Sequence, residues 1–284
     1  MVALVEAAAA PGARNAADLA RMALSAPRLV ADGVRMTARL RLNGVPTFHG
    51  HVVTRMAGEG RVQSVEIARI GADGAPDPAT VRSFAVDAVC LGYGFLPQVE
   101  AARALGCAVA TDPRGGLMVV RDDDGATSVP GVRVIGDGGG LGGARIALAQ
   151  GVIAAAAIAA ELGVSLPAPD VGRARADLAR HRRFQAALWR VYAVPRLPEP
   201  QGEALVCRCE SVTAAAVDAL VETGAADLAA IKRATRAGMG ACGGRYCTTL
   251  IEARLAAAQG PAGFAPRAPF KPVTIGEIAS LARP

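Results

Sequence analysis

The cysteine pattern near the C-terminal end is the feature that most constrains this chain. The sequence reads Cys207-Arg-Cys209, then thirty-two residues, then Cys242-Gly-Gly-Arg-Tyr-Cys247, so four of the six cysteines form two tight pairs. The glycines around the second pair let the backbone wrap closely, with its N–H groups toward sulfur. Four thiolates from two short loops are the ligand set of a [2Fe–2S] cluster. The spacing therefore predicts such a cluster.

Two other chemistries use the same residue type. Zinc also takes four cysteines, but zinc modules space each pair by two to four residues, which Cys-x-Cys fits poorly. Redox-active or structural thiols are the third interpretation. Because Glu6 interrupts the first apolar run and no basic region precedes it, we expect no signal peptide and a cytoplasmic location, where disulfides are rare.

The residues around the cysteines predict a small helical module that clamps the cluster between loops. Five basic residues bring positive charge near an anionic site, although a solvated basic face explains them equally well: Arg208, Lys232, Arg233, Arg236 and Arg245. Ser211-Val-Thr213 is typical of a helix N-cap. The expected helices are 214–221, 226–236 and 248–258.

The stretch "VCRCESVT…IKRATRAGMGACGGRYC" resembles the bacterioferritin-associated-ferredoxin-like [2Fe–2S] domain. More narrowly, it resembles that domain in the flavoprotein α subunits of opine oxidases, hydrogen cyanide synthase, and proline or hydroxyproline dehydrogenases. The motif is specific but covers only about a fifth of the chain. The resemblance implies cluster ligation by Cys207, Cys209, Cys242 and Cys247.

A glycine-rich loop in the middle of the chain has two interpretations. A short strand over 132–135 is expected to end at Gly136-Asp137, followed by a helix over 145–162. Gly138, Gly140 and Gly143 match the G-x-G-x-x-G dinucleotide fingerprint. We reject that assignment because no second strand follows the helix and because an aspartate stands at the head of the loop.

The same stretch, "TSVPGVRVIGDGGGLGGARIALAQGVIAA", resembles the second FAD signature of glutathione-reductase-like flavoproteins. The resemblance implies that Asp137, after Gly136, accepts a hydrogen bond from a ribitol hydroxyl. It also implies that the backbone at Gly142, Gly143 and Ala144 faces the pyrophosphate at a helix N-terminus. A glycine-rich connection without a ligand is the alternative.

A second candidate flavin segment precedes this loop. We expect a buried strand over 85–91 (AVDAVCL), followed by Gly92-Tyr-Gly94-Phe-Leu-Pro97. Glycines directly after a strand let a backbone approach a cofactor, and the segment resembles the crossing back into the FAD domain of two-dinucleotide-domain flavoproteins. Cys90 and Cys107 are expected to be small buried apolar residues.

The N-terminal part has the pattern of a partial nucleotide-binding domain. A buried strand is expected over 1–6, helices over 15–25 and 28–42, and strands over 45–51, 52–56 and 62–70 around a Gly58-Glu-Gly60 turn. Glu6 suits the ribose-binding acid of such a domain or caps an ordinary edge strand. No glycine-rich loop precedes it, so we expect the chain to begin within the domain. His49 and His51, predicted on one face, form at most a two-histidine metal site.

Composition adds little to these motifs. The net charge of +6 and the pI near 9.3 come from arginines spread along the chain without aromatic interleaving, which indicates general surface charge. The helix expected over 174–189 is basic and amphipathic, so it packs on a neighbour or binds a nucleic-acid or membrane surface. The alanine-rich stretch 146–160 carries Gln150 and is not expected to span a membrane.

The predicted fold class is α/β: an incomplete two-dinucleotide-binding-domain flavoprotein fold followed by a small helical [2Fe–2S] module. We expect the nucleotide-binding part over 1–90, the C-terminal part of the FAD domain over 91–165, a linker helix and Pro-rich linker over 166–203, the cluster domain over 204–260, and an extended tail over 261–284. Because the first glycine-rich loop of the family is absent, FAD binding by this chain alone is not implied.

The family resemblance implies an electron-transferring flavo-iron–sulfur subunit, or its C-terminal portion, of a two-component amine or amino-acid dehydrogenase or oxidase. Its substrates would be of the opine, proline or hydroxyproline, sarcosine or glycine type. The expected partner is a substrate-oxidising flavoprotein β subunit. The missing FAD half is expected either on a separate partner chain or to be lacking because this is a truncated product. The alternatives are a zinc- or cluster-stabilised interaction module without enzymatic activity and a pyridine-nucleotide-dependent reductase.

Overall fold

The computed structural model describes residues 1–112, 116–164, 170–195, 199–255 and 273–281. The chain divides into two compact units, the first formed by residues 1–93 and 176–198 and the second by residues 94–175 and 199–284. Each unit therefore combines an earlier and a later segment of the sequence.

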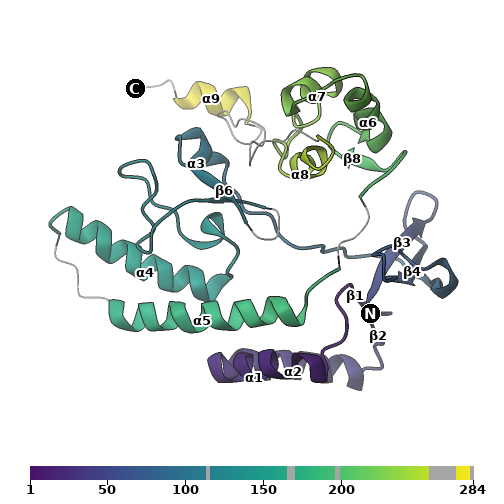
Figure 1. Ribbon diagram of the computed structural model, residues 1–284, viewed down its shortest axis with the longest axis horizontal. Helices are drawn as coiled ribbons and strands as arrows, with labels where there is room; N and C mark the ends of the chain where they lie inside the picture. Colours follow the sequence, from purple (N-terminus) through teal and green to yellow (C-terminus); the bar gives the residue numbers. More distant parts are fainter. Residues whose placement is uncertain (113–115, 165–169, 196–198, 256–272, 282–284) are drawn as a thin grey trace. The chain divides into compact units, whose positions relative to one another are not determined.

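The first unit contains two small sheets and a helical layer (Figure 1). Its elements are β1 (Leu4–Glu6), η1 (Ala13–Asn15), α1 (Ala16–Ser25), α2 (Pro27–Leu42), β2 (Thr47–His49), β3 (His51–Ala57), β4 (Ser64–Arg69), η2 (Pro78–Thr80), β5 (Arg82–Ala85) and most of α5 (Val171–Val191). The predicted N-terminal helices and the strands on either side of the 58–60 turn are confirmed.

The first sheet is the parallel pair β1–β2, in which Glu6 lies opposite His49. The expectation that β1 is buried is wrong, because Leu4 is 40% exposed. A parallel strand is buried only where other elements cover both of its faces, and a two-stranded pair provides little cover. At the strand end, the Glu6 carboxylate accepts the Ala8 N–H at 2.9 Å.

The second sheet is an antiparallel meander of β3, β4 and β5. Its turn depends on Gly58, because a Cβ there would lie 1.9 Å from the Arg61 carbonyl oxygen. The buried apolar residues of β3 and β4 are Val52, Val65, Ile67 and Ala68, whereas Met56 of β3 is 50% exposed. The predicted alternation is therefore confirmed at Val65 and Ile67 of β4 and only in part for β3.

The predicted strand over 85–91 is wrong. Strand β5 occupies Arg82–Ala85 instead, and the residues after Ala85 are irregular and mostly exposed. Cys90, predicted to be buried, is exposed. A fully apolar run forms a buried strand only with paired strands on its edges, and none of the described strands pairs with this segment.

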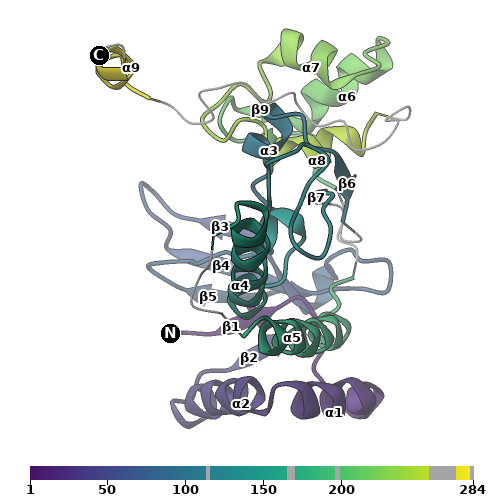
Figure 2. The same ribbon diagram turned by 90° about the vertical axis from the view of Figure 1, so that its left-hand side faces the viewer.

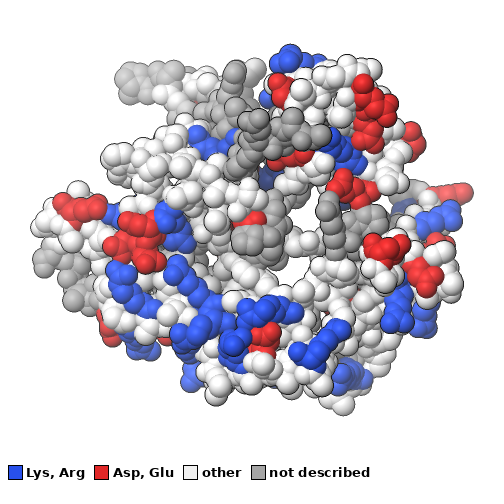
Figure 3. Space-filling model, viewed as in Figure 1, with Lys and Arg blue, Asp and Glu red and all other residues white. Residues whose placement is uncertain are grey.

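Helix α5 confirms the prediction of a basic amphipathic helix that packs on a neighbour. Within the first unit, its Phe184, Ala187 and Val191 pack with Met22 and Ala26, and Figures 1 and 2 both show α5 alongside α1 and α2. Basic side chains gather over the region where Figure 1 draws α5 (Figure 3). The sequence of α5 contains six arginines, which are Arg173, Arg175, Arg180, Arg182, Arg183 and Arg190.

The second unit joins the candidate flavin segments to the cysteine module. Its elements are α3 (Glu100–Ala104), β6 (Val109–Thr111), β7 (Leu117–Val119), η3 (Gly136–Gly139), α4 (Ala144–Glu161), the first turn of α5, β8 (Leu205–Cys207), β9 (Val212–Thr213), α6 (Ala214–Glu222), α7 (Leu228–Thr235), α8 (Cys247–Glu252) and α9 (Ile275–Leu281). A small core of Val99, Ala102, Cys107 and Val119 seats α3, and Cys107 is buried as predicted.

The strand predicted over 132–135 is wrong as a regular strand. Arg133 makes only an isolated bridge to Ala126, although Val132 and Val134 pack against the core under α3. The helix predicted after the glycine-rich loop is confirmed as α4, with Gly143 as its N-cap.

By length and composition, α4 is the one helix of the described residues that could cross a membrane. Core helices pass the same test, and α4 buries Ile146, Ala149, Gln150 and Ile153. Gln150 also accepts the Gly136 N–H at 2.7 Å, so this helix holds the start of the glycine-rich loop.

The cysteine module has a helical core, and its three predicted helices are present. Thr213 caps α6 through the Ala216 N–H and Asp227 caps α7 through the Ala230 N–H. The β8–β9 hairpin was not predicted. The core includes the two buried thiols and consists of Val206, Cys207, Val212, Ala214, Val217, Leu228, Ile231, Ala237, Cys247, Ile251 and Leu255.

The prediction of an extended tail is wrong for residues 275–281, which form helix α9 (Ile275–Leu281). Thr274 and Glu277 cap this helix reciprocally, because Thr274 Oγ1 accepts the Glu277 N–H at 3.2 Å and Glu277 Oε2 accepts the Thr274 N–H at 2.7 Å. Three parts of the predictions lie outside the described residues. They are the linker proline Pro198, the end of the third module helix beyond 255, and the tail residues 261–272 and 282–284.

Candidate functional site

The four paired cysteines come from four places in the fold of the module. Cys207 ends β8 and is 2% exposed, while Cys247 begins α8 and is 1% exposed. Cys209 is exposed and Cys242 is half-buried, and these two lie in the turns that follow β8 and α7. These cysteines are separated by up to forty positions in the sequence, and the elements that carry them, β8, α7 and α8, belong to one module (Figure 1).

The thiols of the early and late pairs meet one to one. The Cys242 thiol lies within hydrogen-bonding reach of the Cys209 thiol, and the Cys247 thiol within reach of the Cys207 thiol. Cys242 is also close enough to Cys247 to act on it electrostatically. The four sulfurs therefore form two pairs, Cys209 with Cys242 and Cys207 with Cys247, and Cys242 and Cys247 bring the pairs within electrostatic range of each other.

The two pairs differ in their electrostatic surroundings. Burial raises the pKa of the Cys247 thiol to about 12, and the nearby Cys207 adds to the shift. Burial acts the same way on Cys242, but the N–H groups of Tyr246 and Gly244 and the Cys209 thiol bring its pKa below the ordinary value. Backbone N–H groups thus face sulfur in the loop that carries Cys242, as the glycines around this cysteine predict.

Gly240 makes room for Cys209. A Cβ at this position would lie 2.1 Å from the Cys209 Cβ and 3.1 Å from its Sγ. The turn after Gly240 uses left-handed backbone at Gly243 and Gly244, where φ is 63° and 87°. These glycines fold the second cysteine loop onto the first.

The arrangement of the thiols fits two irons better than one zinc ion. Among the described residues, no three His, Cys, Asp or Glu side chains form a group that could hold a metal ion, so the four thiols are not gathered around one point. A structural zinc site places four sulfurs about 2.3 Å from one ion, whereas the four thiolates of a [2Fe–2S] cluster are divided between two irons. Two touching pairs match the divided arrangement.

Arg236 and Arg245, both expected near the site, form ion pairs with carboxylates. Arg236 donates from Nε to Glu210 at 2.9 Å. Arg245, between Cys242 and Cys247, donates from Nε and Nη2 to Oε1 of Glu100 at 2.8 and 2.6 Å. Sequence reasoning identified both arginines but neither carboxylate partner, because Glu100 lies 145 positions away.

The glycine-rich loop over 136–143 is organised by Asp137. Its exposed carboxylate accepts the N–H groups of Gly142 and Gly143 through Oδ1, at 3.0 and 3.1 Å. Gly142 packs tightly on Ile146, since a Cβ there would lie 2.9 Å from the Ile146 Cγ2. Asp137 therefore shapes the loop that leads into α4 at Ala144, because its Oδ1 atom holds two backbone N–H groups of that loop.

The second candidate flavin segment reaches the same loop. A Cβ at Gly138 would lie 3.7 Å from the Gln98 carbonyl oxygen, so the chain just after Pro97 packs beside the glycine-rich loop. Gly92 and Gly94 lie in exposed, irregular chain, with a φ of 110° at Gly94. Their contact with a flavin stays a prediction.

Arg121 is a residue of this loop region that sequence reasoning missed. Its guanidinium fills the space beside Gly139, where a Cβ would lie 1.8 Å from the Arg121 Nε. A cation against a loop expected to face phosphate has the right charge for that ligand. Without a motif around Arg121, only the tertiary structure reveals this position.

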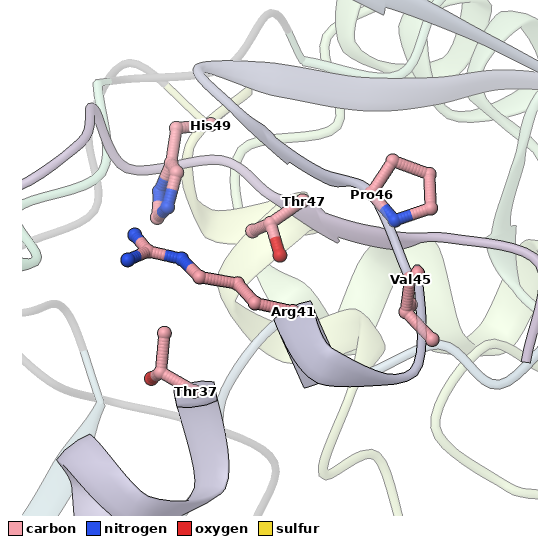
Figure 4. A pocket seen from close by; sticks show the side chains of 7 residues that line it. Thr37, Arg41, Val45, Pro46, Thr47 and His49 are labelled. Atoms are coloured by element: carbon pink, nitrogen blue, oxygen red, sulfur yellow. The ribbon is translucent and has the colours of Figure 1, made fainter. Parts of the chain in front are cut away.

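The first unit has a shallow pocket of about 340 Å³ between the end of α2 and β2 (Figure 4). Figure 4 shows Arg41 reaching toward His49, and none of the predicted cofactor residues lines this pocket. The prediction that His49 and His51 share one strand face is wrong, because Gly50, with a φ of 66°, ends β2 before His51 begins β3.

Comparisons with known proteins agree with this geometry. Residues 5–156 match the family model of the pyridine nucleotide-disulphide oxidoreductases. Residues 205–257, which contain all four paired cysteines, match the BFD-like [2Fe-2S] binding domain. The chain is 22% identical to the L-proline dehydrogenase from P. horikoshii, with a TM-score of 0.57 over 85% of this chain and 47% of that one. At this identity the likeness concerns the fold alone.

Two curated relatives cover much of this chain. Hydrogen cyanide synthase subunit HcnB of Pseudomonas aeruginosa is 30% identical over 91% of this chain and 57% of its own length. An opine oxidase subunit of Rhizobium meliloti is 36% identical over 69% of this chain and 44% of its own length. The chain thus spans about half the length of the curated relatives it matches.

These matches confirm the predicted fold class and its two cofactors, FAD and the [2Fe–2S] cluster. The second family model begins at Leu205, close to the start of β8. The chain belongs to the pyridine nucleotide-disulphide oxidoreductase family, as an oxidoreductase subunit that carries a BFD-like [2Fe–2S] domain.

Proposed function

We propose that this chain relays electrons within a two-component dehydrogenase or oxidase that acts on an amine or amino acid. Its relatives include subunits of hydrogen cyanide synthase and opine oxidase, which supports a glycine-like or opine-like substrate class. The substrate would be oxidised on a partner flavoprotein subunit.

The convergence of the four thiols carries this proposal. Cys207, Cys209, Cys242 and Cys247 come from separate elements yet meet in two touching pairs. The buried thiols of Cys207 and Cys247 could by themselves serve as small apolar core groups. The exposed Cys209 and the half-buried Cys242 have no such role in the core, and they complete a set of four ligands. Bound there, the cluster would supply one-electron transfer beside the two-electron chemistry of the flavin.

On the flavin side, the chain offers Gly136, Asp137 and the backbone from Gly142 to Ala144. Asp137 Oδ1 holds the loop, and none of the described residues donates to Oδ2, so this exposed oxygen suits a ribitol hydroxyl. Arg121 beside Gly139 adds positive charge for the pyrophosphate. We place Gly92 and Gly94 at the approach to the same flavin.

Metal analysis of anaerobically purified chain tests the cluster. We expect about two irons and two acid-labile sulfides per chain, and loss of both when Cys209 or Cys242 is changed to serine. Cys90→Ser is the matched control, because Cys90 is exposed and lies outside the module; its iron content should equal that of the wild type. Zinc without sulfide would refute the proposal.

Flavin binding tests the role of Asp137. Asp137→Ala removes the acceptor of two backbone N–H groups, so we expect a loosened loop, a loss of about 1 kcal/mol of stability, and faster release of FAD from the chain supplied with its native partner. Asp137→Asn keeps an oxygen acceptor, so its rate of FAD release should lie between those of the wild type and Asp137→Ala. Equal flavin release from all three proteins would contradict the assignment.

A further inference from the structure

The ion pair between Arg245 and Glu100 joins the second cysteine loop to helix α3 within the second unit. Arg245 belongs to the loop that carries Cys242 and Cys247, whereas Glu100 is the first residue of α3. Their side chains are only 19% and 20% exposed, and two N–H groups of the guanidinium converge on one carboxylate oxygen. A pair with this geometry and burial is more than a surface contact.

One turn after Glu100, α3 carries a second charged residue, Arg103, which interacts with an acidic residue of the cysteine module. Burial lowers the pKa of Arg103, and the carboxylate of Glu252 in α8 acts against that shift, followed by Glu100. Helix α3 thus presents an acid toward the cysteine loop and a base toward α8. Complementary charges at two points fix an orientation, which a single contact does not.

The other side of α3 rests on the flavin-side core. Val99, Ala102 and Cys107 are buried with Val119. Val132 and Val134 pack against the same core, and they lead directly into Gly136 and Asp137. A continuous chain of contacts therefore runs from the cysteine loop through Arg245, Glu100 and α3 to the glycine-rich loop.

We propose that Glu100 is a positioning residue for the cluster: through Arg245 it holds the 242–247 loop on α3 and compensates a positive charge beside the cluster. This inference rests on the proposed function. A reduced cluster carries one more negative charge than an oxidised one, so an uncompensated arginine nearby favours reduction. Glu100 then lowers the reduction potential of the cluster and keeps its loop in register with the flavin side.

The reduction potential of the full chain, followed by electron paramagnetic resonance, tests the charge effect. Glu100→Gln should raise the potential and Arg245→Gln should lower it. Each shift should be on the order of tenfold in the ratio of reduced to oxidised cluster, about 59 mV. The double variant should return toward the wild type. Asp124→Asn, which breaks the exposed Asp124–Arg175 pair of the same unit, is the control and should leave the potential unchanged.

Hydrogen exchange tests the contact itself. Glu100→Gln and Arg245→Gln should each speed exchange in the cysteine loop about tenfold, and the double variant should be no faster than either single one, because both remove one interaction. Additive effects, or an unchanged potential in Glu100→Gln, would overturn the inference.

A further variant keeps the test decisive. If Glu100→Gln yields too little folded protein, Arg245→Lys retains the charge but not the two-donor geometry. It should then speed loop exchange at a nearly constant potential, and wild-type exchange would count against the inference. A chain with neither iron nor sulfide would instead refute the proposed function, so the two failures are distinguishable.

Discussion

At Gly240, the absence of a side chain decides whether the two cysteine loops can meet. The glycine-rich sequence predicted a close backbone approach there, and the structure identifies the atom being approached as the Cβ of Cys209. The φ of Gly240 is not in the left-handed region, so an alanine would suffer a steric clash rather than backbone strain.

Gly240→Ala should therefore displace Cys209 and destabilise the module by about 1–3 kcal/mol, as in other overpacked sites. We expect lower iron and sulfide per chain and a weaker visible absorption spectrum. Gly33→Ala is the matched control: Gly33 lies in α2 with nothing within 4 Å of its Cβ position, and alanine favours a helix interior. Wild-type iron content in Gly240→Ala would contradict the close packing of Gly240 on Cys209.

Residue-scale prediction was good where a motif restricts the backbone and poor where a partner is distant. The paired cysteines, Asp137 and the cap Thr213 all belong to local patterns, so their positions could be read from the sequence. Glu100 and Arg121 stand in no such pattern. Their importance comes from residues far along the chain, which fold next to them.

Among the elements, α5 shows how helical periodicity survives folding. Its buried residues recur at three- and four-residue spacing and define the face that packs on α1 and α2. An ion pair at the edge of that face joins α5 to α1, because Arg190 donates from Nε and Nη2 to Asp18 Oδ1 at 3.0 and 2.8 Å.

This ion pair predicts a specific acid sensitivity. The hydrogen bond from Arg190 lowers the pKa of Asp18 in the folded chain. The carboxylate therefore stabilises the fold above the unfolded pKa of 3.8, and this contribution is lost as the pH falls through the lower, folded value. Asp18→Asn should unfold at lower urea than the wild type at pH 6, and the difference should shrink as the pH falls through the folded pKa of Asp18, which lies below 3.8.

The single tryptophan of the chain, Trp189, lies beside Arg190 and reports on this unfolding. Asp32→Asn is the control, because the Asp32–Arg35 pair on α2 is more exposed and such pairs contribute little. A wild-type advantage that grew on acidification would show that the sign is wrong.

The two mispredicted strands share one cause. Residues 85–91 and 132–135 have the apolar composition of buried strands, but an apolar run becomes a strand only where neighbouring strands supply hydrogen bonds. Helix α9 was missed for a different reason: Thr274-Ile-Gly-Glu277 is a capping-box sequence that the proline content of the tail outweighed.

On the scale of the whole molecule, the two units should respond differently to loss of the cluster. The module has a small core that includes Cys207 and Cys247, and small domains rely on metal centres for much of their stability. The core of α1, α2 and α5 contains no cysteine.

Removing iron under reducing conditions should therefore increase hydrogen exchange across residues 205–255 by tenfold or more, on the order of the coupling between metal binding and folding. The amides of α1 and of α5 after residue 176 should keep their protection. Equal loss of protection in both units would show that they unfold together, and unchanged exchange in the module would show that its core stands without the cluster.

The sequence by itself determined the local features of this protein: the cysteine spacing, the glycine turns, the helix caps and the periodic helices. Each of these depends on residues within a few positions of one another, so backbone sterics and helical geometry are sufficient to specify them. Only the tertiary structure decided which thiols touch, which carboxylate meets Arg245 and which apolar runs remain unpaired. Those outcomes depend on contacts between distant segments, whose partners no local pattern encodes.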